Sequence, residues 1–242
     1  MQRYFKSIVN DEVFISGDDY HHIKNVMRMK EGHKVSICDA GICYICSLDS
    51  YFDNQVKFVV ESKIEQSNEL NYSIELAVGL LKGDKFDLVI QKATELGATK
   101  IIPVNMKRSI VKLDDKKEKK KLMRWNKIAK EAAEQSKRNI IPVVEAVHTL
   151  SELANRKANL KMYAYELTDN SINMVSHLQE CNENDIILLV VGPEGGIDSS
   201  EVKKLNQADF FEVSLGKRIL RAETAAIHFV SVISAYLEYM GC

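Results

Sequence analysis

The sequence lacks any apolar run approaching the roughly 20 residues that a membrane-spanning helix needs, so no association with a membrane is predicted. Its first residues, MQRYFKSIVNDEVF, contain neither a long apolar stretch nor a small-residue cleavage site, so we expect no signal peptide. The five cysteines are odd in number and irregularly spaced, which favours a reducing compartment over a disulfide framework. We therefore expect a cytoplasmic protein.

The composition is that of an ordinary globular protein, with 45% hydrophobic and 28% charged residues among 242. The net charge of −1 conceals an uneven distribution. Between Asn105 and Ile140 there are 13 Lys and Arg against 5 Asp and Glu, which leaves 20 basic and 29 acidic residues elsewhere. Such a basic segment suits a polyanionic partner such as RNA, although KKEKKK (116–121) also fits a solvated helix end.

The hydrophobic pattern changes near residue 70, which predicts two domains, residues 1–70 and 71–242. The first shows short alternating runs such as KVSIC (34–38) and VKFVV (56–60), typical of a small, mostly antiparallel β domain. In the second, strands and helices alternate, which predicts a parallel sheet covered on both faces. We expect a helix at 21–29, strands at 73–80, 100–104, 161–165, 186–191 and 212–215, and helices after Asp84, at about 116–138, after TLSE (149–152), at 170–179, after Asp198 and at 222–240.

The last expected helix is apolar nearly all round. One packed face needs only an apolar stripe, so a second apolar face indicates a second partner surface. We therefore predict a homodimer that buries this helix, and the alternative is a helix sandwiched inside one subunit. Its apolar residues are Ile227, Phe229, Val230, Val232, Ile233, Tyr236, Leu237 and Met240.

The segment GPEGGIDSSE (192–201) directly follows the apolar run IILLVV (186–191). In open α/β sheets, ligands bind beyond the carboxyl ends of the strands. The segment is not a P-loop, because no Gly-Lys-Ser/Thr follows, and GxGxxG is absent. Gly195 and Gly196 can adopt backbone angles closed to other residues and leave room for a flat ligand. A bare tight turn between strand and helix is the alternative.

A second loop, LGKRILRAETA (215–225), follows the next strand along the chain. Its backbone groups could bind the edge of a purine, and its two arginines could meet a phosphate or a developing negative charge. We expect the two loops to meet in one crevice at neighbouring strand ends.

Three other features favour structural roles. Cys43 and Cys46 form a CxxC in a strand pattern, where residues three apart face opposite sides, and no second pair follows at zinc spacing, so no metal site is predicted. Trp125 is expected to anchor the long helix. Tyr4 and Phe5 could stack on bases, but core packing is favoured.

The motifs together closely resemble the RsmE family of bacterial 16S ribosomal RNA uracil-N3 methyltransferases, which belong to the SPOUT class. The resemblance covers nearly the whole chain. Ile197 and Asp198 stand where an aromatic residue and a serine are common in the family, and Met27 where leucine is common. The matching segments are HHIKNVMRMKEG (21–32), KGDKFDLVIQKATELGATKIIPV (82–104), RSIVKL (108–113), RWNKIAKEAAEQSKRNIIPVV (124–144), GPEGG (192–196) and LGKRILRAETAA (215–226).

This resemblance implies a PUA-like β domain that binds RNA, followed by a catalytic α/β domain with a trefoil knot. It also implies a dimer and S-adenosylmethionine as the cofactor, with 16S ribosomal RNA, in the 30S subunit, as the substrate. The expected cofactor-binding residues are Glu166, Leu167, Val191, Gly192, Pro193, Glu194, Gly195, Gly196, Leu215, Gly216, Ile219, Leu220, Arg221, Thr224 and Ala225. The expected RNA-binding residues are Arg3, His22, Lys24, Arg28, Lys30, Lys107, Arg108, Arg124 and Arg138.

Methylation at N3 of a uracil requires loss of the imide proton, which leaves charge on O2 and O4. Arg221 is the expected stabiliser of that charge. Glu194 or Glu223 could accept the proton if burial raises its pKa towards neutrality, or water could serve. The alternatives are a carboxylate at a helix N-terminus for Glu223 and loop hydrogen bonding for Glu194. Methylation of a ribose 2′-hydroxyl or a transfer RNA base, or a non-catalytic ribosome-binding protein, also stays open.

Overall fold

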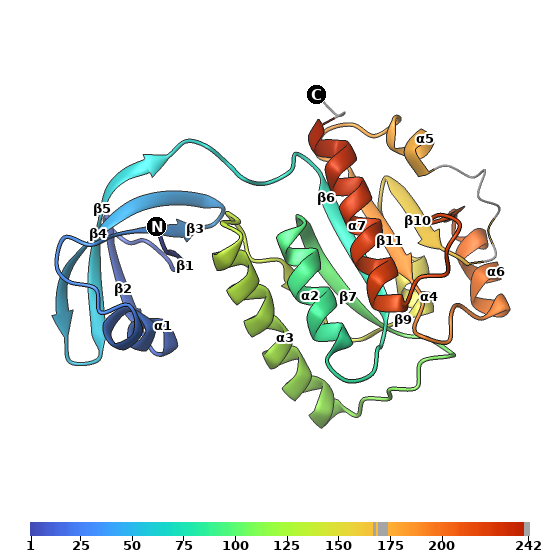
Figure 1. Cartoon of the computed structure of the whole chain (residues 1–242), viewed down its shortest axis with the longest axis horizontal. Coiled ribbons are helices and arrows are strands. Elements are labelled where there is room, and N and C mark those ends of the chain that lie inside the picture. Colours follow the sequence, from blue (N-terminus) through green and yellow to red (C-terminus); the bar gives the residue numbers. More distant parts are fainter. Residues whose placement is uncertain (167, 169–173, 240–242) are drawn as a thin grey trace. The chain divides into compact units, whose positions relative to one another are not determined.

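The computed structural model describes residues 1–166, 168 and 174–239 (Figure 1). The chain forms two compact units, one built from Met1–Glu69 with Ala133–Ile141, and the other from Leu70–Ala132 with the chain from Pro142 onward. The sequence places residues 133–141 in the second domain, whereas the structure assigns them to the first unit. The first unit is therefore discontinuous in sequence.

The first unit contains one five-stranded sheet with the order β1-β3-β4-β5-β2. Only the β1–β3 pair is parallel among these strands, which agrees with the predicted mostly antiparallel domain. The helix expected at 21–29 is instead a short α-helix, α1 (Asp18–His21), that continues as a π-helical turn, η1 (His22–Val26). The strands are β1 (Arg3–Phe5), β2 (Glu12–Ser16), β3 (Lys34–Asp39), β4 (Ile42–Phe52) and β5 (Gln55–Ile64).

The core of this unit forms between alternate residues of the strands and the helical turn. Tyr4 is 2% exposed and packs with Ile15, Ile37 and Phe58. Its predicted role in core packing is therefore confirmed.

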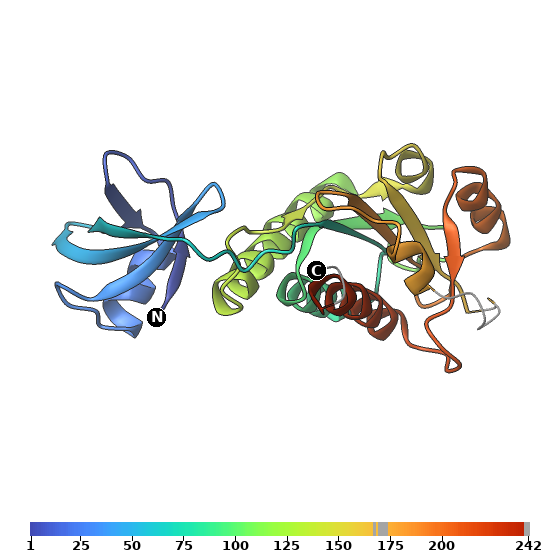
Figure 2. The same ribbon diagram turned by 90° about the horizontal axis from the view of Figure 1, so that it is seen from above.

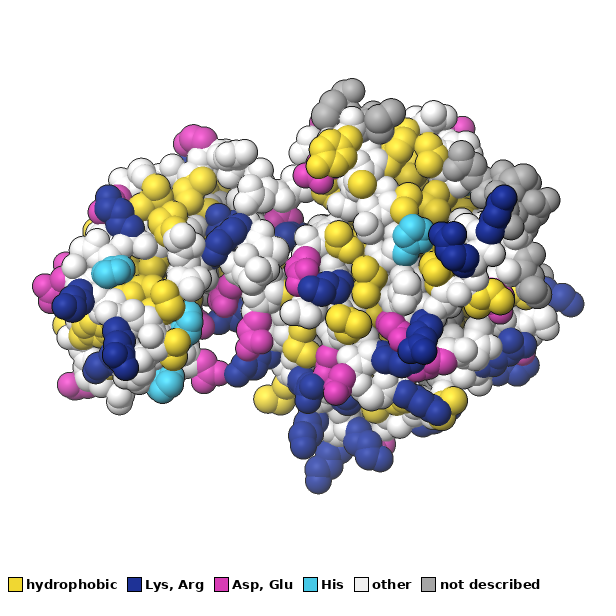
Figure 3. Space-filling model, viewed as in Figure 1, with side chains coloured by type: hydrophobic (Ala, Val, Ile, Leu, Met, Phe, Trp, Pro, Cys, Tyr) yellow, Lys and Arg dark blue, Asp and Glu magenta, His cyan; other side chains and the backbone are white. Residues whose placement is uncertain are grey.

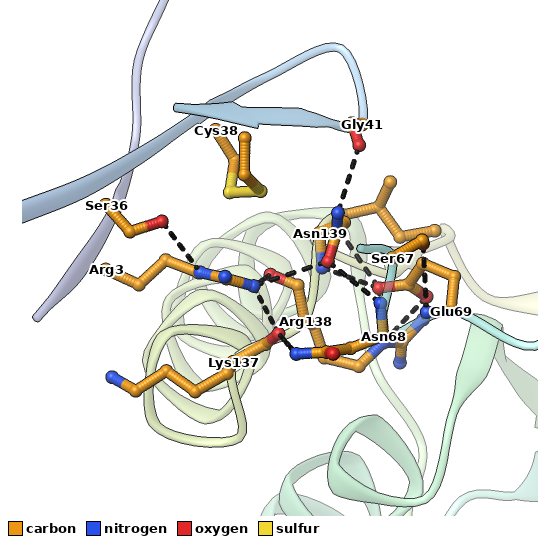
Figure 4. The surroundings of a disulfide bond; sticks show 12 residues. Arg3, Ser36, Cys38, Gly41, Ser67, Asn68, Glu69, Lys137, Arg138 and Asn139 are labelled. Carbon is orange, nitrogen blue, oxygen red and sulfur yellow. Dashed lines mark hydrogen bonds and ion pairs between the residues drawn. A yellow bond between two sulfur atoms is a disulfide. The ribbon is translucent and has the colours of Figure 1, made fainter. Parts of the chain in front are cut away.

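Two cysteines of the first unit form a pair that the sequence did not predict. Cys38 and Cys43 face each other across β3 and β4 and form a disulfide (Figure 4). Cys46 is a buried free thiol. Cys43 and Cys46 are both fully buried because β4 shifts its register between Ile45 and Cys46, and such an irregularity breaks the alternation of a regular strand.

The second unit is built on a parallel sheet with the order β12-β10-β11-β6-β7-β8, in which β9 also pairs with β7. Every pairing in it is parallel, as predicted. The strands are β6 (Ser73–Gly79), β7 (Ala98–Asn105), β8 (Val143–Val144), β9 (His148–Thr149), β10 (Leu160–Ala164), β11 (Ile186–Val191) and β12 (Phe211–Val213). The helices are α2 (Lys85–Glu95), α3 (Asp115–Gln135), α4 (Leu150–Ala154), α5 (Met174–Leu178), α6 (Ser199–Gln207) and α7 (Ala222–Tyr239), and α3 ends in the first unit.

Helices cover both faces of this sheet (Figures 1 and 2). Successive residues of a strand point to opposite faces, and Leu188 and Val190 of β11 share a core with Leu150 and Leu153 of α4 and Leu205 of α6. Helices α2 and α7 pack together, and α7 contacts β11 and β6. These helices therefore shield both faces of the second unit's sheet from solvent.

Local sequence signals account for several helix ends. Both predicted capping boxes are present, Thr149 with Glu152 at α4 and Asp198 with Glu201 at α6. Gly97 follows α2 with a φ of 93°, in the left-handed region that favours glycine. Helix α5 begins at Met174, so the start of the helix expected at 170–179 lies outside the described residues. Within the described chain, no helix meets the length and apolarity that crossing a membrane requires.

Helix α7 has one buried face and one partly open apolar face. Phe229, Val230, Ile233 and Leu237 are buried. Tyr239 at the end of the helix is 77% exposed, and Met240 lies outside the described residues. Ile227, Val232 and Tyr236 are half-buried. Hydrophobic side chains also gather over α7 and the adjoining α2 in Figure 3.

Candidate active site

The carboxyl ends of three strands enclose a cavity of about 590 Å³ in the second unit. The loops after β11 and β12, which carry Gly195 and Leu220, both line it. The sequence predicted that these two strands are neighbours. This prediction is wrong, because β10 lies between them in the sheet. The end of β10 supplies a third wall, at Ala164, Tyr165 and Glu166.

Most of the predicted cofactor residues line this cavity. Thr224, on the first turn of α7, is exposed and does not line it. Leu167 lies outside the described residues. The lining residues that were predicted are Glu166, Val191, Gly192, Pro193, Glu194, Gly195, Gly196, Leu215, Gly216, Ile219, Leu220, Arg221 and Ala225.

The cavity also has lining residues that the sequence reasoning missed. Tyr165 ends the predicted strand 161–165 and could have been found from the rule that ligands bind at carboxyl ends. Lys217 and Arg218 lie inside the loop that was already singled out. Lys85 had no signal of its own, since it follows a different strand. The remaining missed residues are Ala164, Ile197, Ser214 and Ala222.

Close contacts fix the shape of the glycine loop. The Gly196 N–H donates to the Pro193 carbonyl at 2.9 Å, and Gly196 has a φ of 71°. A Cβ on Gly196 would lie 2.7 Å from Glu166 Oε1, and one on Gly192 would lie 2.8 Å from Ile197 Cγ1. Gly196 is therefore required by its backbone angle, and Gly192 by its close packing against Ile197 and the backbone of Gly196.

The end of β6 and the segment that follows it also contact the glycine loop. A Cβ on Gly79 would lie 2.6 Å from both Cδ and N of Pro193. The Lys82 N–H donates to Glu194 Oε1 at 3.0 Å. Pro193 and Glu194 are thus held by a neighbouring strand end rather than by their own loop alone.

Two basic residues hold the other side of the loop. Arg108 donates to the Gly195 carbonyl at 3.1 Å, and Lys107 Nζ lies 2.8 Å from Asp198 Oδ1. The Lys107 N–H also donates to Glu201 Oε1 at 2.8 Å. The hydrogen bond from Lys107, followed by those from Ser200, lowers the pKa of Asp198 well below its usual range. The negative cap of α6 therefore stays ionised and anchors both basic residues.

The three predicted catalytic residues have different surroundings. Arg221 is exposed and lines the cavity directly before α7. Burial raises the pKa of Glu194, but the Lys82 N–H and the charge of Lys85 outweigh it and leave the pKa below its usual value. A carboxylate that acts as a general base near neutral pH needs a raised pKa, so the shift at Glu194 is in the opposite direction. Glu223 is buried, lies 3.3 Å from Lys85 Nζ and does not line the cavity.

The sequence and the fold have counterparts among known proteins. A family model described as an RNA methyltransferase domain matches residues 68–234, and one described as an RNA methyltransferase PUA domain matches residues 15–48. The ribosomal RNA small subunit methyltransferase E of Bacillus subtilis is 41% identical, over 99% of this chain and 98% of that protein. The chain belongs to the ribosomal RNA small subunit methyltransferase E family.

Other members and solved structures agree in length and fold. The Mesomycoplasma hyopneumoniae protein of the same name is 32% identical over 96% of this chain and 98% of its own. The Neisseria gonorrhoeae ribosomal RNA small subunit methyltransferase E, solved bound to S-adenosyl methionine, has a TM-score of 0.86 and 27% identity, with 97% of each chain covered. A putative methyltransferase of Legionella pneumophila, solved with bound SAM, has a TM-score of 0.86 and 28% identity, with 96% of each chain covered.

Several basic residues expected to bind RNA are exposed on the unit that carries them. In the first unit these are Lys24, Arg28 and Lys30. The Lys24 Nζ lies 2.6 Å from the Tyr20 hydroxyl and 5.2 Å from the centre of the Tyr20 ring, and this hydrogen bond raises the pKa of Lys24. His22 is half-buried, with its Nδ1 3.0 Å from the Tyr4 hydroxyl.

In the second unit, helix α3 carries a run of exposed lysines. They include Lys116, Lys117 and Lys119–Lys120, and Figure 3 shows Lys and Arg side chains gathered at the lower end of α3. Arg124 is exposed but lies 2.6 Å from Asp87 Oδ2.

Trp125 is 2% exposed on the same helix. It donates to Asp87 Oδ1 at 3.1 Å and packs on Phe86. Its predicted anchoring role is confirmed.

Arg3 and Arg138, by contrast, are interior residues of the first unit, only 7% and 3% exposed (Figure 4). The Arg3 guanidinium donates to the Arg138 carbonyl at 2.9 Å and also to the Lys137 carbonyl. Arg138 forms an ion pair with Glu69, and burial lowers the pKa of Arg3. Their donors serve internal carbonyl and carboxylate oxygens, so the predicted RNA contact of these two residues is contradicted.

Proposed function

We propose that this protein transfers a methyl group from S-adenosylmethionine to N3 of a uridine in the 16S ribosomal RNA of the small subunit. The observation that carries the proposal is the single cavity formed by the three loops after β10, β11 and β12, in a chain of this family. Relatives at 41% and 32% identity are named ribosomal RNA small subunit methyltransferase E.

The residues around the cavity fit such a cofactor. Its volume of about 590 Å³ is within the range of small-molecule sites, and Gly195 and Gly196 bring the backbone to its wall. The loops 192–196 and 215–221 would hold the cofactor through backbone groups, with Tyr165 and Glu166 as the third wall. When bound, S-adenosylmethionine supplies an electrophilic methyl group on a sulfonium.

The chain's own residues would bind the uracil and stabilise its ionised form. Arg221 is exposed at the cavity wall, where its guanidinium would stabilise the charge on O2 and O4 after the imide proton is lost. Glu194 does not fit the role of base, because its pKa is lowered. Glu223 does not line the cavity and forms an ion pair with Lys85. We therefore propose that water accepts the proton.

Exposed basic residues would bind the RNA backbone. Lys24, Arg28 and Lys30 would contact phosphates from the first unit, and the exposed lysines of α3 from the second. Phosphate contacts position the RNA without reading its sequence. Because each neutralised phosphate releases counterions, affinity should fall steeply with added salt, on the order of 10³-fold between 50 and 200 mM for six contacts.

We also propose a homodimer formed through α7. The half-buried Ile227, Val232 and Tyr236 and the exposed Leu88 of α2 support it. Tyr236→Glu would place a charge in this surface, so the variant should elute as a monomer in light-scattering chromatography, while a dimer of unchanged stability would rule out this surface.

Three finer assignments stand with this proposal. The trefoil knot and an RNA-binding first domain come from the family resemblance, and the division near residue 70 comes from the hydrophobic pattern, with residues 133–141 added to the first unit. A cytoplasmic location follows from the ribosomal substrate.

The decisive experiment is transfer of a tritiated methyl group to 16S RNA, offered naked and in 30S particles, followed by mapping of the methylated nucleotide. Label at N3 of one uridine supports the proposal. Label on a ribose 2′-hydroxyl or on transfer RNA would assign the same cavity to another substrate. If titration with S-adenosylmethionine produces no calorimetric heat, the protein is not such an enzyme.

A further inference from the structure

Lys85 connects two walls of the cavity that come from distant parts of the chain. Its Nζ lies 3.6 Å from Glu194 Oε1 in the glycine loop and 3.3 Å from Glu223 Oε2 in the first turn of α7. Lys85 itself opens α2 and lines the cavity. One ammonium group therefore lies between two carboxylates that belong to different walls.

The two carboxylates depend on this cation to different degrees. Glu194 also accepts a hydrogen bond from the Lys82 N–H. The Glu223 side chain is only 12% exposed, and its Oε2 atom accepts no hydrogen bond from the described part of the chain. A buried carboxylate without a paired charge is costly, so the Lys85 ammonium offsets part of the cost of burying Glu223, in addition to the N-terminus of α7.

We propose that Lys85 is a positioning residue, which holds the glycine loop against the start of α7 and so keeps the cofactor cavity in its binding shape. This inference rests on the proposed function and names a residue that acts through Glu194 and Glu223 rather than on the reacting atoms. Removal of its charge leaves two like charges at most 6.9 Å from each other (3.6 plus 3.3 Å). Their repulsion would separate the two walls.

The expected result is a loss of cofactor affinity with little change in turnover at saturation. In Lys85→Met, the Kd for S-adenosylmethionine should rise about fivefold, the upper end for a partly exposed ion pair, while kcat stays near the wild-type value. Lys85→Arg restores the charge and should restore most of the affinity. Lys92→Met is the matched control, because Lys92 lies on the same helix and pairs with Glu95 within it.

A double-mutant cycle separates this role from direct contact between Lys85 and the cofactor. In a Glu194→Gln/Glu223→Gln background there is no repulsion to relieve, so Lys85→Met should no longer change the Kd. A loss that persists in that background would overturn the proposal. Methylthioadenosine lacks the amino acid carboxylate. If Lys85 shapes the walls, Lys85→Met should weaken the binding of methylthioadenosine and of S-adenosylmethionine by the same factor. A loss of affinity for S-adenosylmethionine alone would also overturn the proposal.

The experiment is isothermal titration calorimetry of the full-length protein, with kcat and KM from methyl transfer. Circular dichroism melting of each variant checks that it is folded, and Lys85→Gln, which also removes the charge, carries the test if Lys85→Met does not fold. A wild-type protein that binds no S-adenosylmethionine would refute the proposed function. A wild-type protein that binds it, with Lys85→Met unchanged in Kd, would refute this inference alone.

Discussion

Gly79→Ala tests whether the end of β6 sets the position of the glycine loop. The added Cβ would lie 2.6 Å from Cδ and N of Pro193, and carbon atoms pack best at about 3.5–4.0 Å. The proline ring and the backbone cannot rotate away as a flexible side chain would, so the loop must move by about 1 Å. Overpacking of this kind costs about 1–3 kcal/mol.

The cost should appear in cofactor binding. If the loop relaxes in the free protein and must return on binding, the Kd for S-adenosylmethionine rises between about 5-fold and about 150-fold. Gly83→Ala is the matched control, since Gly83 lies in the same β6–α2 segment, and a Cβ there meets no atom within 4 Å. Its φ of 60° makes alanine cost about 1–2 kcal/mol of stability.

Calorimetry and thermal melting of both variants separate the two effects. We expect both to melt at lower temperature than the wild type, and only Gly79→Ala to lose cofactor affinity. A wild-type Kd for Gly79→Ala, or an equal loss of affinity in Gly83→Ala, would show that the end of β6 does not set the position of the glycine loop.

Three further predictions address catalysis, stability and pH. Arg221→Ala should retain cofactor binding and lose about 10²–10³-fold in methyl transfer; unchanged turnover would remove Arg221 from the mechanism. Arg156→Met leaves Glu75, whose side chain is 2% exposed, paired with Lys100 alone among the described residues, and should destabilise the protein by about 1–3 kcal/mol in urea denaturation, whereas Lys63→Met breaks only an exposed pair and should change nothing measurable. Burial raises the pKa of the Cys46 thiol from 9.0 to about 11. About 0.1% of this thiol is therefore thiolate at pH 8. Its alkylation by iodoacetamide should be slow at this pH and should accelerate as the pH rises. Because the unfolded state loses this proton first, the thiol's contribution to stability is present below pH 9 and is lost between about pH 9 and 11; rapid alkylation of the folded protein at pH 8 would contradict this.

The parts of the fold that depend on local pattern were predictable. The run IILLVV became the buried strand β11, and the two capping boxes became the starts of α4 and α6. Such signals act within a few residues, through side-chain alternation or a hydrogen bond to a nearby N–H. Both loops that line the cavity could therefore be found from the sequence.

What the sequence did not reveal depends on contacts between distant segments. Strand order is set by pairing in space, so nothing local placed β10 between β11 and β12. The lowered pKa of Glu194 depends on the N–H of Lys82, 112 residues away. The burial of Arg3 depends on carbonyl groups more than 130 residues further along the chain. A basic residue near the N-terminus of an RNA-binding domain fits phosphate contact equally well until those acceptors are known.

The discontinuity of the first unit has a consequence for how the protein is made. The acceptors that satisfy Arg3 are supplied by residues 137–139, and a buried guanidinium without acceptors is destabilising. Synthesis proceeds from the N-terminus, and domains generally fold as units. All five strands of the first unit lie within residues 3–64, but Arg3 gains these acceptors only after residues 137–139 have been synthesised. A fragment that stops at residue 70 would lack them and should be less stable than the complete first unit.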